Sequence, residues 1–124
     1  MAPLRQPCRI LVVDDDAGIR ATLRDILESE GYPVLTAGNA ARALPLVEAE
    51  QPGIIVLDMR MPVASGGDFA AALRARGVAI PILVLTAARD PAAVAREIGA
   101  ADWVGKPFDV LDLLEQVARL DAEA

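Results

Sequence analysis

Histidine is absent from this chain of 124 residues, and cysteine occurs once, at Cys8. Without histidine, the chain lacks the usual general base, the usual zinc ligand and any phosphohistidine of its own. A single cysteine excludes an internal disulfide and a metal site built from several cysteines. Aromatic residues make up only 3% of the sequence, against 54% hydrophobic residues, so the core is predicted to be aliphatic.

Basic residues are also few: 12 lysines and arginines stand against 18 acidic residues, which gives a net charge of −6. Direct binding of nucleic acid needs a basic surface, so it is not expected. No apolar run approaches the ~20 residues of a membrane-spanning helix, and residues 1–9 lack the apolar stretch of a signal peptide. The sequence therefore predicts a soluble cytoplasmic protein without a membrane partner.

Short apolar runs predict the strands. Three apolar runs, at residues 10–13, 54–57 and 82–85, are each followed directly by a polar residue. Continuous apolar runs of this length are typical of strands buried on both faces of a parallel sheet. Residues 34–37 and 102–104 are weaker strand candidates.

Segments with helical periodicity lie between these strands. Their apolar markers are Ile19, Leu23, Ile26 and Leu27; Leu44 and Val47; Phe69, Ala72 and Leu73; Val94 and Ile98; and Val110, Leu114, Val117 and Leu120. The helix boundaries are predicted at Gly31, Asn39, Gly77, Asp90 with Pro91 and Gly99, and Asp109. Pro45 is expected to kink or shorten the second helix.

Five strand–helix repeats in a chain of this length predict a single α/β domain, with a parallel sheet covered by helices on both sides. We place this domain at residues 9–121, between short tails at 1–8 and 122–124. Whether the chain stands alone or belongs to a longer protein with an output domain stays open.

Polar residues follow the predicted strands: Asp14, Asp15 and Asp16, then Asp58, Thr86 and Lys106. In an open α/β sheet, ligands bind at the carboxyl ends of the strands, so these side chains are expected to meet at one edge. Clustered carboxylates without His or Cys favour a hard cation such as Mg²⁺. The only lysine and a hydroxyl beside them would suit an anion such as a phosphoryl group.

Each of these residues also has a plainer interpretation. The three aspartates could only cap a helix, and Asp58 could lie in a solvated loop. Thr86 could be structural, and Lys106 before Pro107 could belong to a turn. The occurrence of all four signals at successive strand ends favours a shared site.

Four segments resemble the receiver domain of bacterial two-component response regulators: ILVVDDD at 10–16, VLDMRMP at 56–62 with Gly66, VLTA at 84–87 and GKPF at 105–108. The resemblance covers nearly the whole chain, and the spacing between the segments also matches. It implies a flavodoxin-like (βα)5 three-layer sandwich with strand order 2-1-3-4-5.

The resemblance also implies a role for each matching residue. Asp58 would accept a phosphoryl group from a sensor histidine kinase or a histidine phosphotransfer protein. Mg²⁺ or Mn²⁺ would be bound by Asp15 and Asp58, by Asp14 through water and by the backbone carbonyl of Arg60. Thr86 and Lys106 would contact phosphoryl oxygens, and the Lys106–Pro107 peptide bond would be cis. Asp16 would lie outside the metal site and cap a helix.

The resemblance further implies a switch. Trp103 stands where receivers carry an aromatic residue that changes rotamer as Thr86 moves towards the phosphoryl group; the alternative is a simple core aromatic. Phosphorylation would then alter the face formed by the fourth helix, fifth strand and fifth helix, where a second copy or an output partner would bind.

Three positions depart from common features of the family: Arg60, whose guanidinium could lie across the mouth of the site, Ser65 and Ala88. They leave the lifetime of the phosphoryl group open. Two other functions were considered: a pseudo-receiver that is never phosphorylated, and a haloacid dehalogenase-like aspartyl phosphatase. Gly18 stands where the latter enzymes usually have Thr or Val. We therefore expect a signalling domain that assists its own phosphorylation, and not a turnover enzyme.

Overall fold

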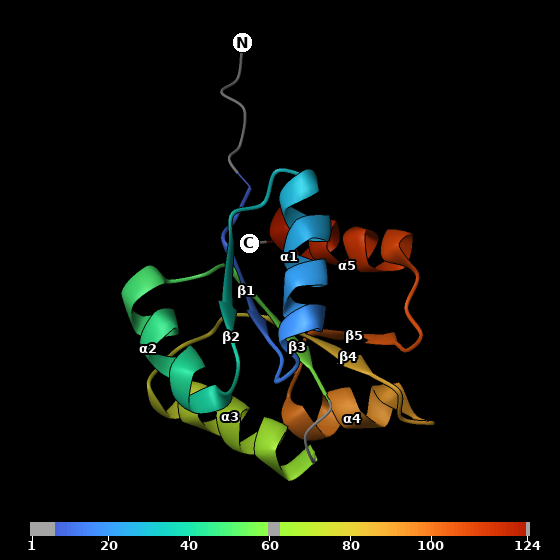
Figure 1. Ribbon diagram of the computed structural model, residues 1–124. Coiled ribbons are helices and arrows are strands. Elements are labelled where there is room, and N and C mark those ends of the chain that lie inside the picture. Colours follow the sequence, from blue (N-terminus) through green and yellow to red (C-terminus); the bar gives the residue numbers. More distant parts are fainter. Residues whose placement is uncertain (1–6, 60–62, 124) are drawn as a thin grey trace.

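The computed structural model describes residues 7–59 and 63–123, in which strands and helices alternate along the chain (Figure 1). The strands are β1 (Ile10–Val13), β2 (Val34–Ala37), β3 (Ile54–Asp58), β4 (Ile82–Thr86) and β5 (Asp102–Gly105). The helices are α1 (Ala17–Ser29), α2 (Ala40–Glu50), α3 (Val63–Ala75), α4 (Pro91–Ile98) and α5 (Val110–Glu123). All five predicted strands and all five predicted helices are present.

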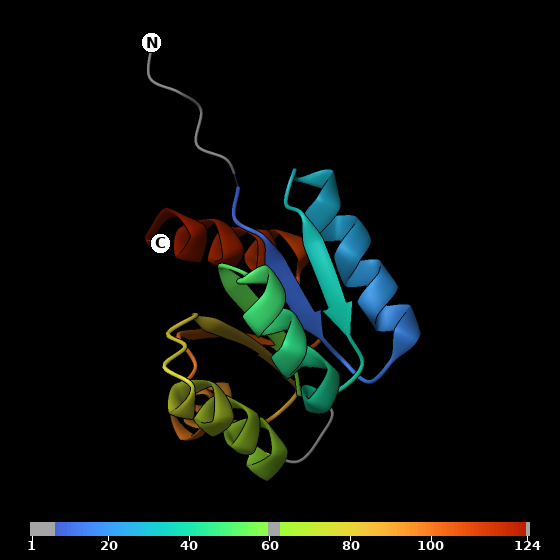
Figure 2. The same cartoon turned by 90° about the vertical axis from the view of Figure 1, so that its left-hand side faces the viewer.

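The strands form one parallel sheet in the order β2-β1-β3-β4-β5, as the resemblance implied. Helices α1 and α5 cover one face, and α2, α3 and α4 cover the other, which gives three layers (Figures 1 and 2). The predicted flavodoxin-like fold is confirmed.

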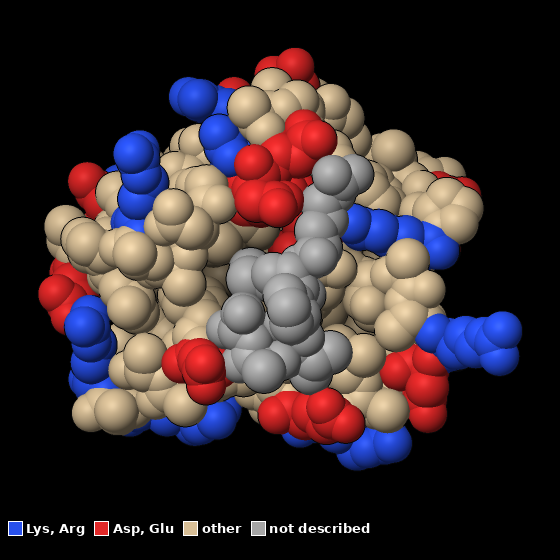
Figure 3. All heavy atoms as spheres, turned by 60° about the horizontal axis from the view of Figure 1, so that its bottom comes forward, with Lys and Arg blue, Asp and Glu red and all other residues tan. Residues whose placement is uncertain are grey.

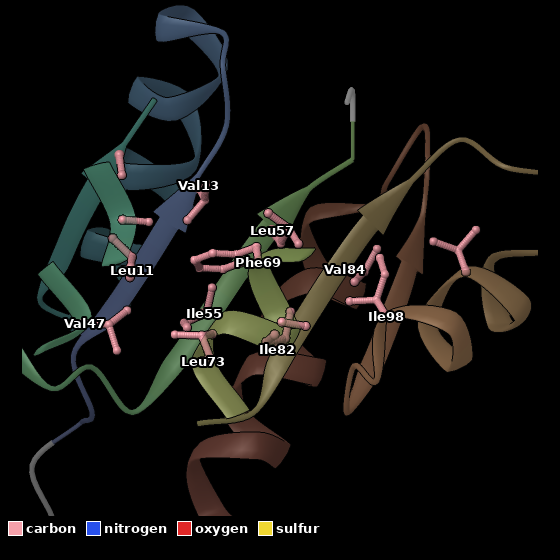
Figure 4. Close-up of a cluster of buried hydrophobic side chains, with 14 residues drawn as sticks. Leu11, Val13, Val47, Ile55, Leu57, Phe69, Leu73, Ile82, Val84 and Ile98 are labelled. Atoms are coloured by element: carbon pink, nitrogen blue, oxygen red, sulfur yellow. The ribbon is translucent and has the colours of Figure 1, made fainter. Parts of the chain in front are cut away.

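Two aliphatic clusters hold the layers together, because successive strand residues point to opposite faces. Leu11 and Ile55 point towards α2, α3 and α4, whereas Ile10 and Ile54 point towards α1 and α5. Figure 4 shows the first cluster, in which Phe69 is the one aromatic side chain labelled. The predicted aliphatic core is confirmed.

Local signals fix the helix ends. The side chains of Asp16, Asn39 and Asp90 accept hydrogen bonds from backbone N–H groups in the first turns of α1, α2 and α4. Gly99 ends α4 with a φ of +80°, a conformation that favours glycine. The predicted boundaries of the fourth helix, at Asp90 with Pro91 and at Gly99, are thus confirmed.

Pro45 does not shorten α2, which continues to Glu50. The expected shortening is therefore wrong. The residue whose carbonyl loses its hydrogen bond is Ala41, and both Ala41 and Pro45 are exposed, so water can take the place of the missing donor. Ala43 and Val47, on the other side of the helix, are buried and attach it to the sheet. None of the described helices is long and apolar enough to cross a membrane.

Candidate functional site

The candidate site lies at the carboxyl edge of the sheet, where β1, β3, β4 and β5 end. Because the strands are parallel, Asp14, Asp58, Thr86 and Lys106 all follow or end strands at this edge. They include all the buried polar residues among those whose burial is described: Asp14, Asp58 and Thr86. Figure 3 shows a group of acidic side chains near the centre of one face of the molecule, with both basic and acidic side chains around its rim.

Asp58 is the last residue of β3 and is only 1% exposed, so the interpretation as a solvated-loop residue is wrong. Its Oδ1 accepts a hydrogen bond from Nζ of Lys106, with which it forms an ion pair. Lys106 is therefore more than a turn residue. The second oxygen of Asp58, Oδ2, is buried and has no hydrogen-bond partner among the described residues.

Asp14 is fully buried directly after β1. Its backbone N–H donates to the carbonyl of Ala37 at 3.1 Å, and its Oδ1 accepts from the N–H of Asp16 at 2.9 Å. Like Asp58, it has a buried oxygen, Oδ2, with no described partner. The pKa of Asp14 is raised to about 7, mainly by burial; the hydrogen bond from the N–H of Asp16 lowers this pKa, and the nearby Asp58 and Asp15 raise it.

These oxygens fit a hard cation. Two buried carboxylates that lack partners on one oxygen each, from β1 and β3, would gain ligand bonds and lose their mutual repulsion. Asp15 is adjacent but exposed. Within the described residues no three acidic, cysteine or histidine side chains form a group that could hold a metal ion. Arg60, the other predicted ligand, lies outside the described residues.

Thr86 ends β4 and is 4% exposed. Its hydroxyl oxygen accepts a hydrogen bond from the N–H of Ala88 at 3.1 Å, and its carbonyl accepts from the N–H of Lys106 at 2.7 Å. The second bond joins the end of β4 to the residue that carries the amine. The predicted cis peptide bond between Lys106 and Pro107 is confirmed.

A hollow of about 340 Å³ opens beside the ion pair. It is lined by Ile19, Thr22, Leu23, Asp58, Lys106, Pro107 and Phe108, so α1 and the segment after β5 form its walls. Asp58 thus lines a mainly apolar hollow while remaining almost fully buried.

The resemblance implied other roles for Asp16 and Trp103. Asp16 caps α1 by accepting from the N–H of Ile19 at 3.0 Å, as predicted. Trp103 lies on β5, where it pairs with Val84, and is 38% exposed. Trp103 is therefore only partly buried, and its role as a switch residue stays a prediction.

Sequence reasoning missed one residue of the site. Arg20, on α1, donates from Nη1 to the carbonyl of Asp14 at 2.7 Å. Its position six residues after Asp14 is the only signal in the sequence. It is a weak one, because the arginine could equally well have faced solvent.

The structure is thus a parallel five-stranded α/β domain with buried aspartates and a lysine at the carboxyl edge of its sheet. Residues 10–118 match the family described as the response regulator receiver domain. The chain belongs to this family and is a receiver domain of two-component response regulators; neither the pseudo-receiver nor the phosphatase alternative is favoured.

Relatives and solved structures agree. The chain is 41% identical to response regulator MprA of Mycolicibacterium vanbaalenii over 92% of its length and 50% of that protein's. It is 37% identical to transcriptional regulatory protein PdtaR of Mycobacterium tuberculosis over 90% of its length and 55% of that protein's. It therefore spans about half the length of these relatives.

Among solved structures, chemotaxis response regulator CheY4 of Vibrio cholerae matches with a TM-score of 0.81 and 32% identity, over 92% of this chain and 98% of that one. The receiver domain of Francisella response regulator 1452 matches with a TM-score of 0.83 and 27% identity, over 94% and 98%.

Proposed function

We propose that this receiver domain accepts a phosphoryl group on Asp58 from the phosphohistidine of a sensor histidine kinase or a histidine phosphotransfer protein. An oxygen of the Asp58 carboxylate attacks phosphorus. The phosphorus–nitrogen bond of the donor breaks, and its electron pair returns to the imidazole ring. The observation that supports this most strongly is the buried ion pair between Asp58 and Lys106, beside the buried carboxylate of Asp14.

Metal-binding residues complete the proposal. Asp15 and Asp58 would bind Mg²⁺ or Mn²⁺ directly, with the backbone carbonyl of Arg60 and, through water, Asp14. The bound cation supplies charge neutralisation for the phosphoryl oxygens. The two buried Oδ2 atoms support this assignment, because each gains a partner only when a cation or donor arrives.

Lys106 and Thr86 act on the other side of the phosphoryl group. The amine of Lys106, now bound to Asp58, would also donate to a phosphoryl oxygen, and the Thr86 hydroxyl to another. Catalysis then consists of positioning and electrostatic stabilisation, which is what phosphoryl transfer needs. An arginine at 106 would be a poor substitute, because its planar fork differs in shape and reach from a compact amine.

Signal output would use the face formed by α4, β5 and α5. Phosphorylation shifts a pre-existing equilibrium of this face, with Thr86 and Trp103 as the switch residues, and a second copy or an output partner binds the changed surface. The domain assists its own phosphorylation and dephosphorylation in the cytoplasm and does not turn over a separate substrate.

Incubation with Mg²⁺ and acetyl phosphate tests the acceptor. The intact chain should gain one phosphoryl group, seen by mass spectrometry and lost at alkaline pH, and Asp58→Asn should gain none. Asp68→Asn, on the exposed side of α3, is a matched control that should be labelled like the wild type. Undiminished labelling of the Asp58 variant would show that another residue is the acceptor.

A further inference from the structure

Arg20 lies between two loops at the carboxyl edge of the sheet. Its guanidinium donates to the carbonyl of Asp14 at 2.7 Å, in a partly buried hydrogen bond. The other neighbour of the guanidinium is Gly38, directly after β2: a Cβ atom at Gly38 would lie 3.2 Å from Nη1 of Arg20. The arginine therefore fills the space between the loop after β1 and the loop after β2.

The absence of a side chain at Gly38 leaves room for the guanidinium of Arg20. Unlike Gly31, Gly77 and Gly99, Gly38 does not have a positive φ, so its backbone conformation does not require glycine. What the missing side chain provides is room: a Cβ at 3.2 Å would force the guanidinium to move by a few tenths of an ångström, and a larger side chain would force it farther.

The contacts of Asp14 show what the guanidinium achieves. The backbone N–H of Asp14 is held by Ala37, its Oδ1 by the N–H of Asp16, and its carbonyl by Arg20. Only Oδ2 has no described partner. Three hydrogen bonds thus hold Asp14 in place, and Oδ2 is the carboxylate oxygen that a cation could still bind.

We propose that Arg20 is a positioning residue, which orients the carboxylate of Asp14 for a divalent cation by bridging the loops after β1 and β2. This inference rests on the proposed metal site. The positive charge of the Arg20 guanidinium would by itself repel Mg²⁺. The proposed role is different: the guanidinium holds the Asp14 carboxylate in a fixed position, and that carboxylate attracts Mg²⁺. Loss of the arginine therefore has opposite effects on affinity through charge and through position, and position dominates.

Titration of the full-length chain with Mg²⁺ in a calorimeter separates the two effects. Residues that orient metal ligands commonly change affinity by 10-fold to 100-fold, so Arg20→Ala should raise the dissociation constant about 10-fold. Arg24→Ala is the matched control: Arg24 lies one turn further along α1, is exposed and pairs with Glu28 at 3.2 Å. It should stay within about twofold of the wild type, because an exposed charge is screened.

A second variant keeps the charge and displaces the group. Gly38→Val should also weaken Mg²⁺ binding several-fold, although Arg20 is still present. Urea denaturation of each variant gives the folded fraction, so that the affinity refers to folded protein. An unchanged or tighter dissociation constant in Arg20→Ala, or wild-type affinity in a folded Gly38→Val, would overturn the inference.

Asp14→Asn distinguishes this inference from the proposed function on which it rests. If Asp14→Asn loses affinity for Mg²⁺ and Arg20→Ala does not, only the role of Arg20 is wrong. If Asp14→Asn binds Mg²⁺ like the wild type, the proposed metal site itself is wrong, and the role of Arg20 falls with it.

Discussion

The hydrophobic layers and the carboxyl edge of the sheet are built on the same strands, but the layers bury apolar side chains and the edge buries carboxylates. In the layers, buried side chains such as Leu83 and Ile55 belong to clusters of apolar side chains. At the edge, Asp14 and Asp58 are equally buried, and each keeps one oxygen without a described partner. Burial of apolar atoms stabilises the fold, whereas burial of an unpartnered carboxylate costs stability. The edge is therefore retained for its chemistry and supported by the layers.

The largest expected effect breaks the layers. Leu83 is fully buried on β4, among side chains of α1 and α5, so Leu83→Ala should lower the free energy of unfolding by about 2–5 kcal/mol. Leu111→Ala on α5 removes the same atoms from a side chain that is 68% exposed, and should change stability by less than about 0.5 kcal/mol. Urea denaturation of both measures the difference. Equal losses would contradict the division between layers and surface.

A smaller effect, of opposite sign, comes from the edge. The pKa of Asp14 is raised to about 7, mainly by burial, so the folded state holds this proton more tightly than the unfolded state. The stability that the proton gives is complete below the ordinary pKa of 3.8 and is lost as pH rises to about 7. Asp14→Asn should therefore stabilise the metal-free protein at pH 8, where the native carboxylate is charged and buried, and should stabilise it less at pH 5.

Urea denaturation in the presence of EDTA, at pH 5 and pH 8, measures this gain. Asp25→Asn is the control, because Asp25 is exposed on α1 and should show no such gain at either pH. A destabilised Asp14→Asn at pH 8 would mean that the carboxylate contributes to the fold, in the way that the side chains of the layers do.

The smallest expected effect lies within the row of three aspartates. Asp16 accepts from the N–H of Ile19 and caps α1, so Asp16→Ala should cost about 1 kcal/mol of stability without loss of Mg²⁺ binding. Asp15→Ala should do the reverse: it loses Mg²⁺ binding and leaves stability equal or higher, because carboxylate repulsion is relieved. Calorimetric titration and urea denaturation of both variants measure the pair of effects. Loss of Mg²⁺ binding in Asp16→Ala would contradict this division of roles.

The fold was predictable because its signals are local and repeated. Apolar runs marked the strands, and Asp90, Pro91 and Gly99 framed α4 as the structure has it. The shortening expected at Pro45 did not occur, because the cost of a proline in a helix depends on whether the freed carbonyl reaches water. That depends on the packing of α2, which no local pattern contains.

The site was predictable in its members but not in its contacts. Parallel strands bring their carboxyl ends together, so Asp58 and Lys106 could be placed at one edge from the sequence. Which oxygen of Asp58 is paired and which is left without a described partner depends on side-chain packing. Arg20 was missed for the same reason: its position depends on the space beside Gly38, which follows β2 and is distant from Arg20 in sequence.

The hydrogen bond from Ala88 to the Thr86 hydroxyl gives the carboxyl edge a polarity. The Thr86 hydroxyl accepts one hydrogen bond from the backbone and keeps its own proton to donate, and the protonated amine of Lys106 can only donate. Asp14 and Asp58, when ionised, can only accept. The edge is thus divided into a half that selects cations and a half that selects unprotonated oxyanions. A fully ionised phosphoryl group offers only acceptors and so matches the donor half. A protonated phosphoryl group would place its own O–H donor against the donors of Lys106 or Thr86.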